Sequence, residues 1–214
     1  MAVSRVPLIN AGNGPDEHPT QTLVDLLAIY RAHGRIDNLD ITIRGDPKYG
    51  RAVRSLVIAL ALYPKVRINF VSHPAVRIGE DITNLLEKRG IYYEETTELS
   101  KEILNRTDVL YLTRIQEERY EDKVLLGEIL KGLTTLDLKQ VSQLPPNSTI
   151  LHPLPRNIDL ALEVDGDARA RYFEQSEHAV AARMAALKEA IEPWTIRNRW
   201  LRFEPSMISA PVLS

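Results

Sequence analysis

Four short polar stretches contain the side chains that are best suited to do chemistry. They are residues 18–21, 45–51, 113–119 and 152–156. Arginine, histidine and glutamine recur in these stretches, whereas a serine or cysteine nucleophile does not. Groups of these types bind anions and polarise carbonyl groups. They predict chemistry by charge stabilisation, without a covalent intermediate.

The first stretch places a histidine and an amide at the start of a predicted helix. His18 and Gln21 are three residues apart, so both can face the same side of the first turn. The free backbone N–H groups of that turn also favour an anion. We therefore predict that these two side chains grip a carbonyl or phosphate oxygen. The tetrapeptide alone leaves a plain helix cap as the alternative.

The next two stretches supply arginines for a carboxylate. Arg51 opens a predicted helix after a loop with two glycines, and Arg114 alternates with Gln116 directly after a predicted strand. Alternation puts Arg114 and Gln116 on one side of the chain. The planar fork of a guanidinium matches a carboxylate, so these residues suit a dicarboxylate. Solvated side chains on a charged loop are the alternative.

The fourth stretch is constrained by proline. Pro153 and Pro155 flank Leu154, which predicts an extended backbone at this residue. Carbonyl oxygens held in this way can accept hydrogen bonds from an amine. A rigid turn that leaves the sheet is the alternative.

The elements that position these stretches alternate along the chain. Strands are predicted at 6–10, 39–43, 66–71, 91–93, 108–112 and 148–151, and helices at 19–33, 51–63, 81–89, 99–105 and 172–190. This alternation predicts an α/β fold, a doubly wound parallel sheet flanked by helices. Such sheets bind ligands at the carboxyl ends of their strands, so the site should lie just after Ile43, Leu112 and Leu151.

Two of the helices carry apolar patterns. The first is expected to bury a stripe of Leu23, Leu26, Leu27 and Tyr30. The last has Ala179, Ala182, Ala186 and Leu187 on related faces. Residues 193–214 show no period and are expected to form a tail.

Composition limits the classes of partner and cofactor. Among 214 residues, 27 are basic and 29 acidic, a balance that suggests neither nucleic acid nor an anionic membrane as a partner. The absence of cysteine excludes disulfides, thiolate metal sites and a cysteine nucleophile. Five histidines show no ligand spacing, so we expect no metal and no other cofactor. No apolar stretch approaches the roughly 20 residues of a membrane span, and we expect a cytoplasmic protein.

Taken in order, these motifs resemble the aspartate carbamoyltransferase family over about residues 6–191. The matching residues are Asn10-Ala11-Gly12 with His18-Pro19-Thr20-Gln21-Thr22-Leu23, Gly45-Asp46 with Lys48-Tyr49-Gly50-Arg51, Tyr111 through Arg119, His152-Pro153-Leu154-Pro155-Arg156, and Arg171-Tyr172-Phe173 with Arg183-Met184. The sister ornithine carbamoyltransferases are less similar. They typically have cysteine where this chain has Thr20 and Pro153.

The resemblance implies a reaction and a set of roles. L-Aspartate would attack carbamoyl phosphate to give N-carbamoyl-L-aspartate and phosphate in pyrimidine biosynthesis. His18 would be catalytic, polarising the carbamoyl carbonyl. The implied carbamoyl-phosphate-binding residues are His18, Gln21, Pro153 and Leu154. The implied aspartate-binding residues are Arg51, Arg114 and Gln116.

The resemblance also implies a division of the chain. Residues 1–34 would be a remnant of a carbamoyl-phosphate domain with a linking helix, 35–170 the aspartate-binding domain, and 171–192 a helix that packs on the largely missing domain. The family's Ser-x-Arg-Thr phosphate loop is not found in the sequence, and Ala52 stands where a threonine is usual.

We therefore expect weak or no activity from this chain alone, and a homo-oligomer or a companion chain with the phosphate-binding domain. The first and last helices should then expose apolar faces. A non-catalytic paralogue that binds a dicarboxylate or a partner enzyme is the alternative.

Overall fold

A five-stranded parallel sheet forms the centre of the computed structural model, which describes residues 6–14 and 16–197, with side chains up to residue 192. The strand order is β3-β2-β1-β4-β5. The strands are β1 Asp40–Arg44, β2 Arg67–Val71, β3 Tyr92–Thr96, β4 Val109–Leu112 and β5 Thr149–Leu151. The predicted α/β fold with a parallel sheet flanked by helices is confirmed.

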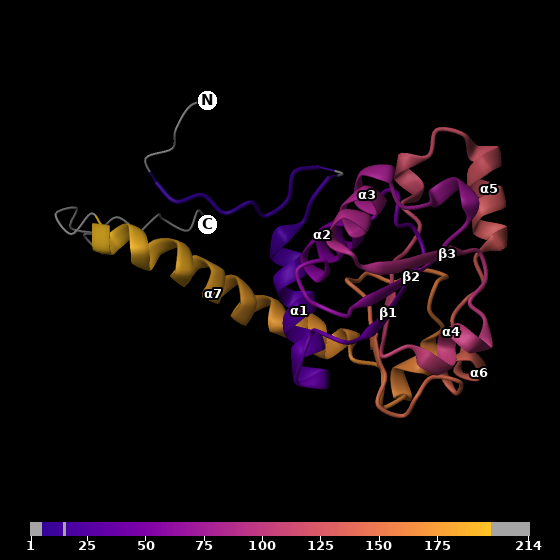
Figure 1. Ribbon diagram of the computed structural model, residues 1–214. Helices are drawn as coiled ribbons and strands as arrows, with labels where there is room; N and C mark the ends of the chain where they lie inside the picture. The colour runs from indigo at the N-terminus through magenta and orange to yellow at the C-terminus, as the bar shows by residue number, and fades with distance from the viewer. Residues whose placement is uncertain (1–5, 15, 198–214) are drawn as a thin grey trace, which may run out of the picture.

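Helices cover both faces of the sheet (Figure 1). The α-helices are α1 Pro19–His33, α2 Arg51–Leu60, α3 Glu80–Arg89, α4 Lys101–Arg106, α5 Lys123–Gly132, α6 Leu138–Val141 and α7 Tyr172–Arg197. Three short 3-10 helices are η1 Pro74–Val76, η2 Glu117–Arg119 and η3 Leu162–Gly166. Helices α1 to α3 pack on one face of the sheet, and α4, α6 and the start of α7 on the other.

Strand β4 is buried on both faces of the sheet and is hydrophobic at all four of its positions. Val109 and Tyr111 belong to the core beneath α1 to α3, while Leu110 and Leu112 belong to the core on the opposite face. Successive side chains of a strand point to opposite faces. Because helices cover both faces of this sheet, both sets of β4 side chains are hydrophobic.

The expected strand at residues 6–10 is wrong. The structure assigns these residues no strand, and the side chains of Val6 and Leu8 are 55% and 79% exposed. A strand forms only where another strand edge can satisfy its backbone groups. All strands of the described sheet pair with one another, and none of them pairs with this segment.

The apolar stripe expected on α1 is wrong at two of its four positions, while Leu26 packs against the core. Leu23 and Tyr30 are exposed, whereas Val24, Ala28 and Ile29 are buried. Helix α1 packs against both α2 and α7, so its buried surface is set by two neighbours. Leu23 lies outside the contact with these two helices, and Leu26 and Leu27 are only half-buried.

The segment between β4 and β5 contains two helices that the apolar pattern did not predict. Asp122 caps α5 by accepting hydrogen bonds from Val124 N at 2.9 Å and Leu125 N at 3.1 Å. Asp137 caps α6 by accepting from Gln140 N at 2.8 Å. An aspartate just before a helix is a recognised start signal, so both helices could have been found from it.

Helix α7 begins against the sheet and then extends away from it (Figure 1). It continues to Arg197, beyond its predicted end, and residues 198–214 of the expected tail lie outside the described residues. Ala182 is buried. Up to residue 192, the exposed large apolar side chains of α7 are Phe173, Val180, Met184, Leu187 and Ile191.

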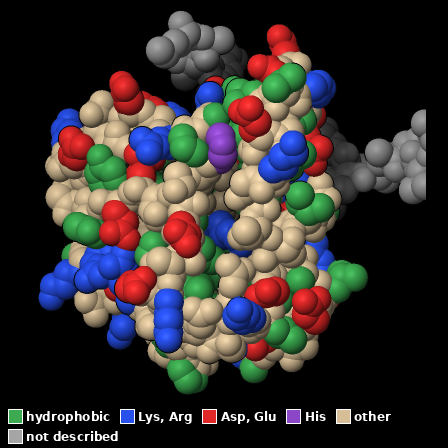
Figure 2. Space-filling model, turned by 90° about the vertical axis from the view of Figure 1, so that its right-hand side faces the viewer, with side chains coloured by type: hydrophobic (Ala, Val, Ile, Leu, Met, Phe, Trp, Pro, Cys, Tyr) green, Lys and Arg blue, Asp and Glu red, His purple; other side chains and the backbone are tan. Residues whose placement is uncertain are grey.

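Charged side chains of both signs are interspersed over the face shown in Figure 2. Among residues 6–14 and 16–197, none of the helices combines the length and the apolar character that a bilayer crossing needs.

Candidate functional site

The loops after β1, β4 and β5 meet the first turn of α1 around one hollow at the carboxyl edge of the sheet. Strands β1 and β4 are neighbours, and the strand order reverses between them, which is where open α/β sheets form ligand crevices. The hollow has a volume of about 350 Å³. The structure brings all the predicted site residues to it: His18, Gln21, Arg51, Arg114, Gln116, Pro153 and Leu154.

Arg114 holds a carboxylate of its own chain at this hollow. Its Nη2 lies 2.6 Å from Glu118 Oε1, and its Nη1 lies 3.0 Å from Glu118 Oε2. Nη2 also donates to Gln116 Oε1 at 3.3 Å, so Arg114 and Gln116 do share one side. The hydrogen bonds from Arg114 lower the pKa of Glu118 to about 2, which keeps its carboxylate charged. Sequence reasoning gave Glu118 no role.

Arg51 connects α2 with the loop that precedes α1. It is the first residue of α2, and its Nη1 donates to the backbone oxygen of Gly14 at 3.2 Å. The side chain is exposed, so most of its guanidinium remains available to a ligand. The positive end of the α2 dipole adds to its charge.

His18 is held so that it can donate one hydrogen bond. Its backbone N donates to Ser55 Oγ at 2.8 Å, and its Nδ1 lies 3.4 Å from Thr20 Oγ1. Burial lowers the pKa of His18, and the nearby charges of Arg51 and Arg183 lower it further. The ring is therefore neutral at pH 7. In the tautomer whose Nδ1 accepts from the Thr20 hydroxyl, the proton resides on Nε2.

A buried aspartate that sequence reasoning did not single out joins two of the loops. Asp46 is fully buried, and its Oδ1 accepts from Tyr49 N at 3.0 Å. Its Oδ2 accepts from Gln116 N at 3.1 Å and from the Tyr120 hydroxyl at 3.0 Å. The β1 loop thereby fixes the backbone next to Arg114. The position of Asp46, directly after Gly45 at the end of a predicted strand, is the signal from which its role could have been predicted.

The expected extended backbone at Leu154 is wrong. Its φ is 46°, and the Leu154–Pro155 peptide bond is cis. The reason is a hydrogen bond from Leu154 N to His152 Nδ1 at 2.9 Å, which curls the backbone toward the ring. His152 Nε2 in turn lies 2.7 Å from Asp159 Oδ2. The ring orientation, and not proline alone, sets which backbone groups reach the hollow.

Comparison with known proteins agrees with this arrangement. The family profile "Aspartate/ornithine carbamoyltransferase, Asp/Orn binding domain" matches residues 37–189, more than half of the chain. The chain belongs to this family.

Relatives of the chain in this carbamoyltransferase family include plant and bacterial enzymes. It is 41% identical over 187 residues to the chloroplastic aspartate carbamoyltransferase of Oryza sativa, covering 87% of this chain and 51% of that protein. It is 39% identical over 189 residues to the aspartate carbamoyltransferase catalytic subunit of Parabacteroides distasonis, covering 88% and 61%. The chain thus spans about half to three-fifths of the length of these relatives.

Solved structures of the carbamoyltransferase family show the same fold. The catalytic subunit of M. jannaschii aspartate transcarbamoylase matches with a TM-score of 0.79 at 41% identity, covering 89% of this chain and 61% of that one. The Trypanosoma cruzi aspartate transcarbamoylase in complex with carbamoyl phosphate and aspartate matches with a TM-score of 0.78 at 35% identity, covering 83% and 58%.

Beneath the hollow, this member of the family contains a buried network that sequence reasoning missed. Asp25 is fully buried and accepts from Gln21 Nε2 at 2.9 Å, Gln175 Nε2 at 2.7 Å and the Tyr111 hydroxyl at 2.9 Å. Gln175 Oε1 accepts from His152 N at 2.9 Å. One carboxylate therefore ties Gln21 to the loop after β5. In the described part of the chain, no side-chain cluster could hold a metal ion.

Asp25→Asn is expected to change the pH dependence of stability. Burial raises the pKa of Asp25 to about 6, an effect that the bonds from Gln21, Gln175 and Tyr111 offset only in part. Between about pH 4 and 6 the folded protein then binds more protons than the unfolded one. This contribution to stability is present at low pH and is lost as pH rises through 6. The loss is about 3 kcal/mol at pH 7.

Urea unfolding of both proteins at pH 4 and pH 7 measures this effect. We compare the unfolding free energy of Asp25→Asn with that of the native chain at each pH. The difference, variant minus native, should be more positive at pH 7 than at pH 4 by about 3 kcal/mol. Asp37→Asn, at an exposed aspartate, is the matched control. If the unfolding free energies of Asp25→Asn and the native chain differ by the same amount at pH 4 and pH 7, the prediction is wrong.

Proposed function

We propose that this chain supplies the aspartate-binding side of an aspartate carbamoyltransferase. The reaction is carbamoyl phosphate plus L-aspartate to N-carbamoyl-L-aspartate and phosphate, in pyrimidine biosynthesis. The observation that carries the proposal is the meeting of Arg51, Arg114 and Gln116 with His18 around one hollow. Relatives named aspartate carbamoyltransferase, and a relative solved with carbamoyl phosphate and aspartate, support it.

In this proposal, the arginines bind the two carboxylates of aspartate. The ion pair between Arg114 and Glu118 supports this assignment, because the guanidinium already binds a carboxylate of its own chain. A carboxylate of aspartate would take the place of Glu118, and Gln116 would add a hydrogen bond. Arg51 would hold the second carboxylate. Two cationic groups also favour a dicarboxylate over the cationic side chain of ornithine.

His18 and Gln21 would bind the carbamoyl group. A neutral His18 can donate from Nε2 to the carbamoyl oxygen, on which negative charge grows as the amine attacks. The carbonyl oxygens of Pro153 and Leu154 would accept hydrogen bonds from the carbamoyl and attacking amines. Catalysis would come from the positioning of two reactants and from charge stabilisation.

The domain division and the partners are part of the same proposal. Residues 1–34 would be part of a carbamoyl-phosphate domain together with a linking helix, 35–170 would form the aspartate-binding domain, and 171–192 would be a helix that packs on the carbamoyl-phosphate domain. The exposed apolar side chains of α7, among them Val180, Met184 and Leu187, support contact with a companion chain or a second copy. A cytoplasmic location stays a prediction.

The purified chain should be assayed for carbamoyl-aspartate formation alone and with a separately expressed carbamoyl-phosphate-binding half of a relative. We expect activity in the mixture, much above that of either part, and its loss in Arg114→Ala. Arg77→Ala, an exposed arginine outside the hollow, is the control and should retain activity. Inactivity of every mixture, with the chain folded and L-aspartate still bound, would instead support a non-catalytic dicarboxylate-binding paralogue.

A further inference from the structure

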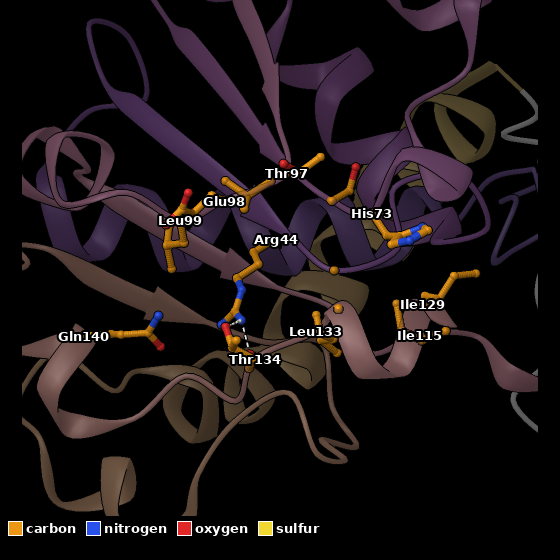
Figure 3. A pocket seen from close by; sticks show the side chains of 14 residues that line it. Arg44, His73, Thr97, Glu98, Leu99, Ile115, Ile129, Leu133, Thr134 and Gln140 are labelled. Carbon is orange, nitrogen blue, oxygen red and sulfur yellow. Dashed lines mark hydrogen bonds between the residues drawn. The ribbon is translucent and has the colours of Figure 1, made fainter. Parts of the chain in front are cut away.

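A second cavity lies at the carboxyl edge of the sheet, away from the site residues named above. It has a volume of about 240 Å³. The ends of β1, β2 and β3 form one side, and residues 129–134 with α6 form the other (Figure 3). None of the seven predicted site residues lines it. It is therefore a separate space, and the proposed transferase reaction does not use it.

A buried arginine extends into the middle of this cavity (Figure 3). Arg44 is the last residue of β1 and is only 4% exposed. Its Nη2 donates to the backbone oxygen of Thr134, and to Thr134 Oγ1 at 2.7 Å. Its Nη1 is buried and has no hydrogen-bond partner among the described residues. One edge of the guanidinium is thus anchored, and the other is left for a ligand.

The charge of Arg44 is not neutralised by an ion pair within the described ranges, 6–14 and 16–192. Asp159 and Asp137 are near enough to favour its charged form, but both are engaged elsewhere. Asp159 binds His152, and Asp137 caps α6. Burial lowers the pKa of Arg44 to about 10, which still leaves it charged at pH 7.

A second buried polar atom lines the same cavity. Gln140 Oε1 has no hydrogen-bond partner in the described part of the chain. A buried donor or acceptor without a partner is costly, so native structures rarely leave one unexplained. Arg44 and Gln140 thus line one cavity, and each has a buried polar atom without a partner among the described residues: a cationic donor in Arg44 and a neutral acceptor in Gln140. Apolar side chains such as Leu99 and Leu133 form part of its wall.

We propose that this cavity binds a small anion that also carries a hydrogen-bond donor, with Arg44 Nη1 donating to the anionic oxygen and Gln140 Oε1 accepting from the donor. Hydrogen phosphate and small hydroxy acids belong to this class. The volume of the cavity, about 240 Å³, accommodates a ligand of this size. The buried, partly anchored guanidinium favours an anion because it is desolvated before the ligand arrives.

The cavity lies behind the two loops that carry the candidate active site. Gly45 and Ile115 line it, and they directly precede Asp46 and Gln116, which are hydrogen-bonded to each other. A bound anion would contact this pair of loops at residues other than those that line the hollow of Arg51 and Arg114. The proposal concerns binding alone and holds whether or not the chain is a transferase.

Inorganic phosphate, titrated into the full chain at pH 7 and followed by backbone amide NMR shifts, tests the proposal. Phosphate should shift the amides of Thr97, Thr134 and Gln140. Arg44→Met, which keeps an unbranched apolar stem and removes the guanidinium, should weaken the phosphate affinity measured from these shifts about tenfold or more. Sulfate has no donor for Gln140 and should bind this cavity more weakly than phosphate.

Two further variants distinguish phosphate binding in this cavity from phosphate binding at Arg51 and Arg114 in the first hollow. They also distinguish a loss of binding from a loss of folding. Arg51→Ala should remove any phosphate shifts around Gly50 and leave those around Thr134. Gln140→Glu places a carboxylate in the cavity and should abolish phosphate binding there without removing Arg44. Phosphate shifts confined to the first hollow, or binding near Thr134 that survives both Arg44→Met and Gln140→Glu, would overturn the proposal.

Discussion

Arg114→Ala is expected to weaken the binding of L-aspartate by roughly 100-fold or more, because two charge-assisted hydrogen bonds to one carboxylate are lost. The geometry supports this size of effect. The fork of Arg114 already holds both oxygens of Glu118, at 2.6 and 3.0 Å. An NMR titration of the chain with L-aspartate measures the loss, with Arg77→Ala as the matched control.

Glu118→Gln should act in the opposite direction. Glu118 competes with the ligand for Arg114, but its side chain is 54% exposed, and exposed ion pairs of this i,i+4 type contribute well under 1 kcal/mol. Releasing Arg114 should therefore improve aspartate affinity by only about two- to fivefold. If Arg114→Ala binds L-aspartate as well as the native chain does, the assignment of Arg114 to a carboxylate is wrong.

Gly45→Ala is expected to destabilise the fold by on the order of 4 kcal/mol or more. The φ of Gly45 is +127°, a conformation that side-chain-bearing residues rarely adopt. A Cβ at this position would lie 1.8 Å from the backbone oxygen of Thr113. That oxygen belongs to the loop after β4, so the two loops cannot separate without disturbing the bonds that Asp46 makes to Gln116 and Tyr120.

Gly127→Ala is the matched control. It lies within α5, where an added Cβ meets nothing within 4 Å, and alanine should stabilise the helix by about 0.5–1 kcal/mol. Urea unfolding of both variants compares the two effects directly. Should Gly45→Ala unfold within about 1 kcal/mol of the native chain, the close approach of the two loops is not a constraint on this fold.

Much of the architecture follows from local patterns in the sequence. Predicted strands such as 39–43 and 108–112 alternate with predicted helices, and this alternation indicated a parallel sheet. The topology of such sheets places strand ends together, so Arg51, Arg114 and Pro153 could be assigned to one edge without knowledge of their contacts. The structure brings them to one hollow, while their roles stay predictions.

Patterns that depend on a neighbour were less well predicted. The stripe expected on α1 failed at two of its positions because α2 and α7 together decide which side of that helix is buried. The extended shape expected at Leu154 failed because the His152 ring binds its N–H. Periodicity and proline content describe one segment at a time and carry no information about what packs against it.

By itself, then, the sequence determined the fold class, the positions of the five sheet strands along the chain and the residue types at the strand ends, since these depend on interactions within a few residues. Only the tertiary structure decided which buried polar groups meet. Asp25 and Gln175, 150 residues apart, share a hydrogen bond, Asp46 reaches Tyr120, and the fork of Arg44 extends from β1 to Thr134. A hydrogen bond forms only when distant segments are brought to about 3 Å, and that approach is a property of the folded chain.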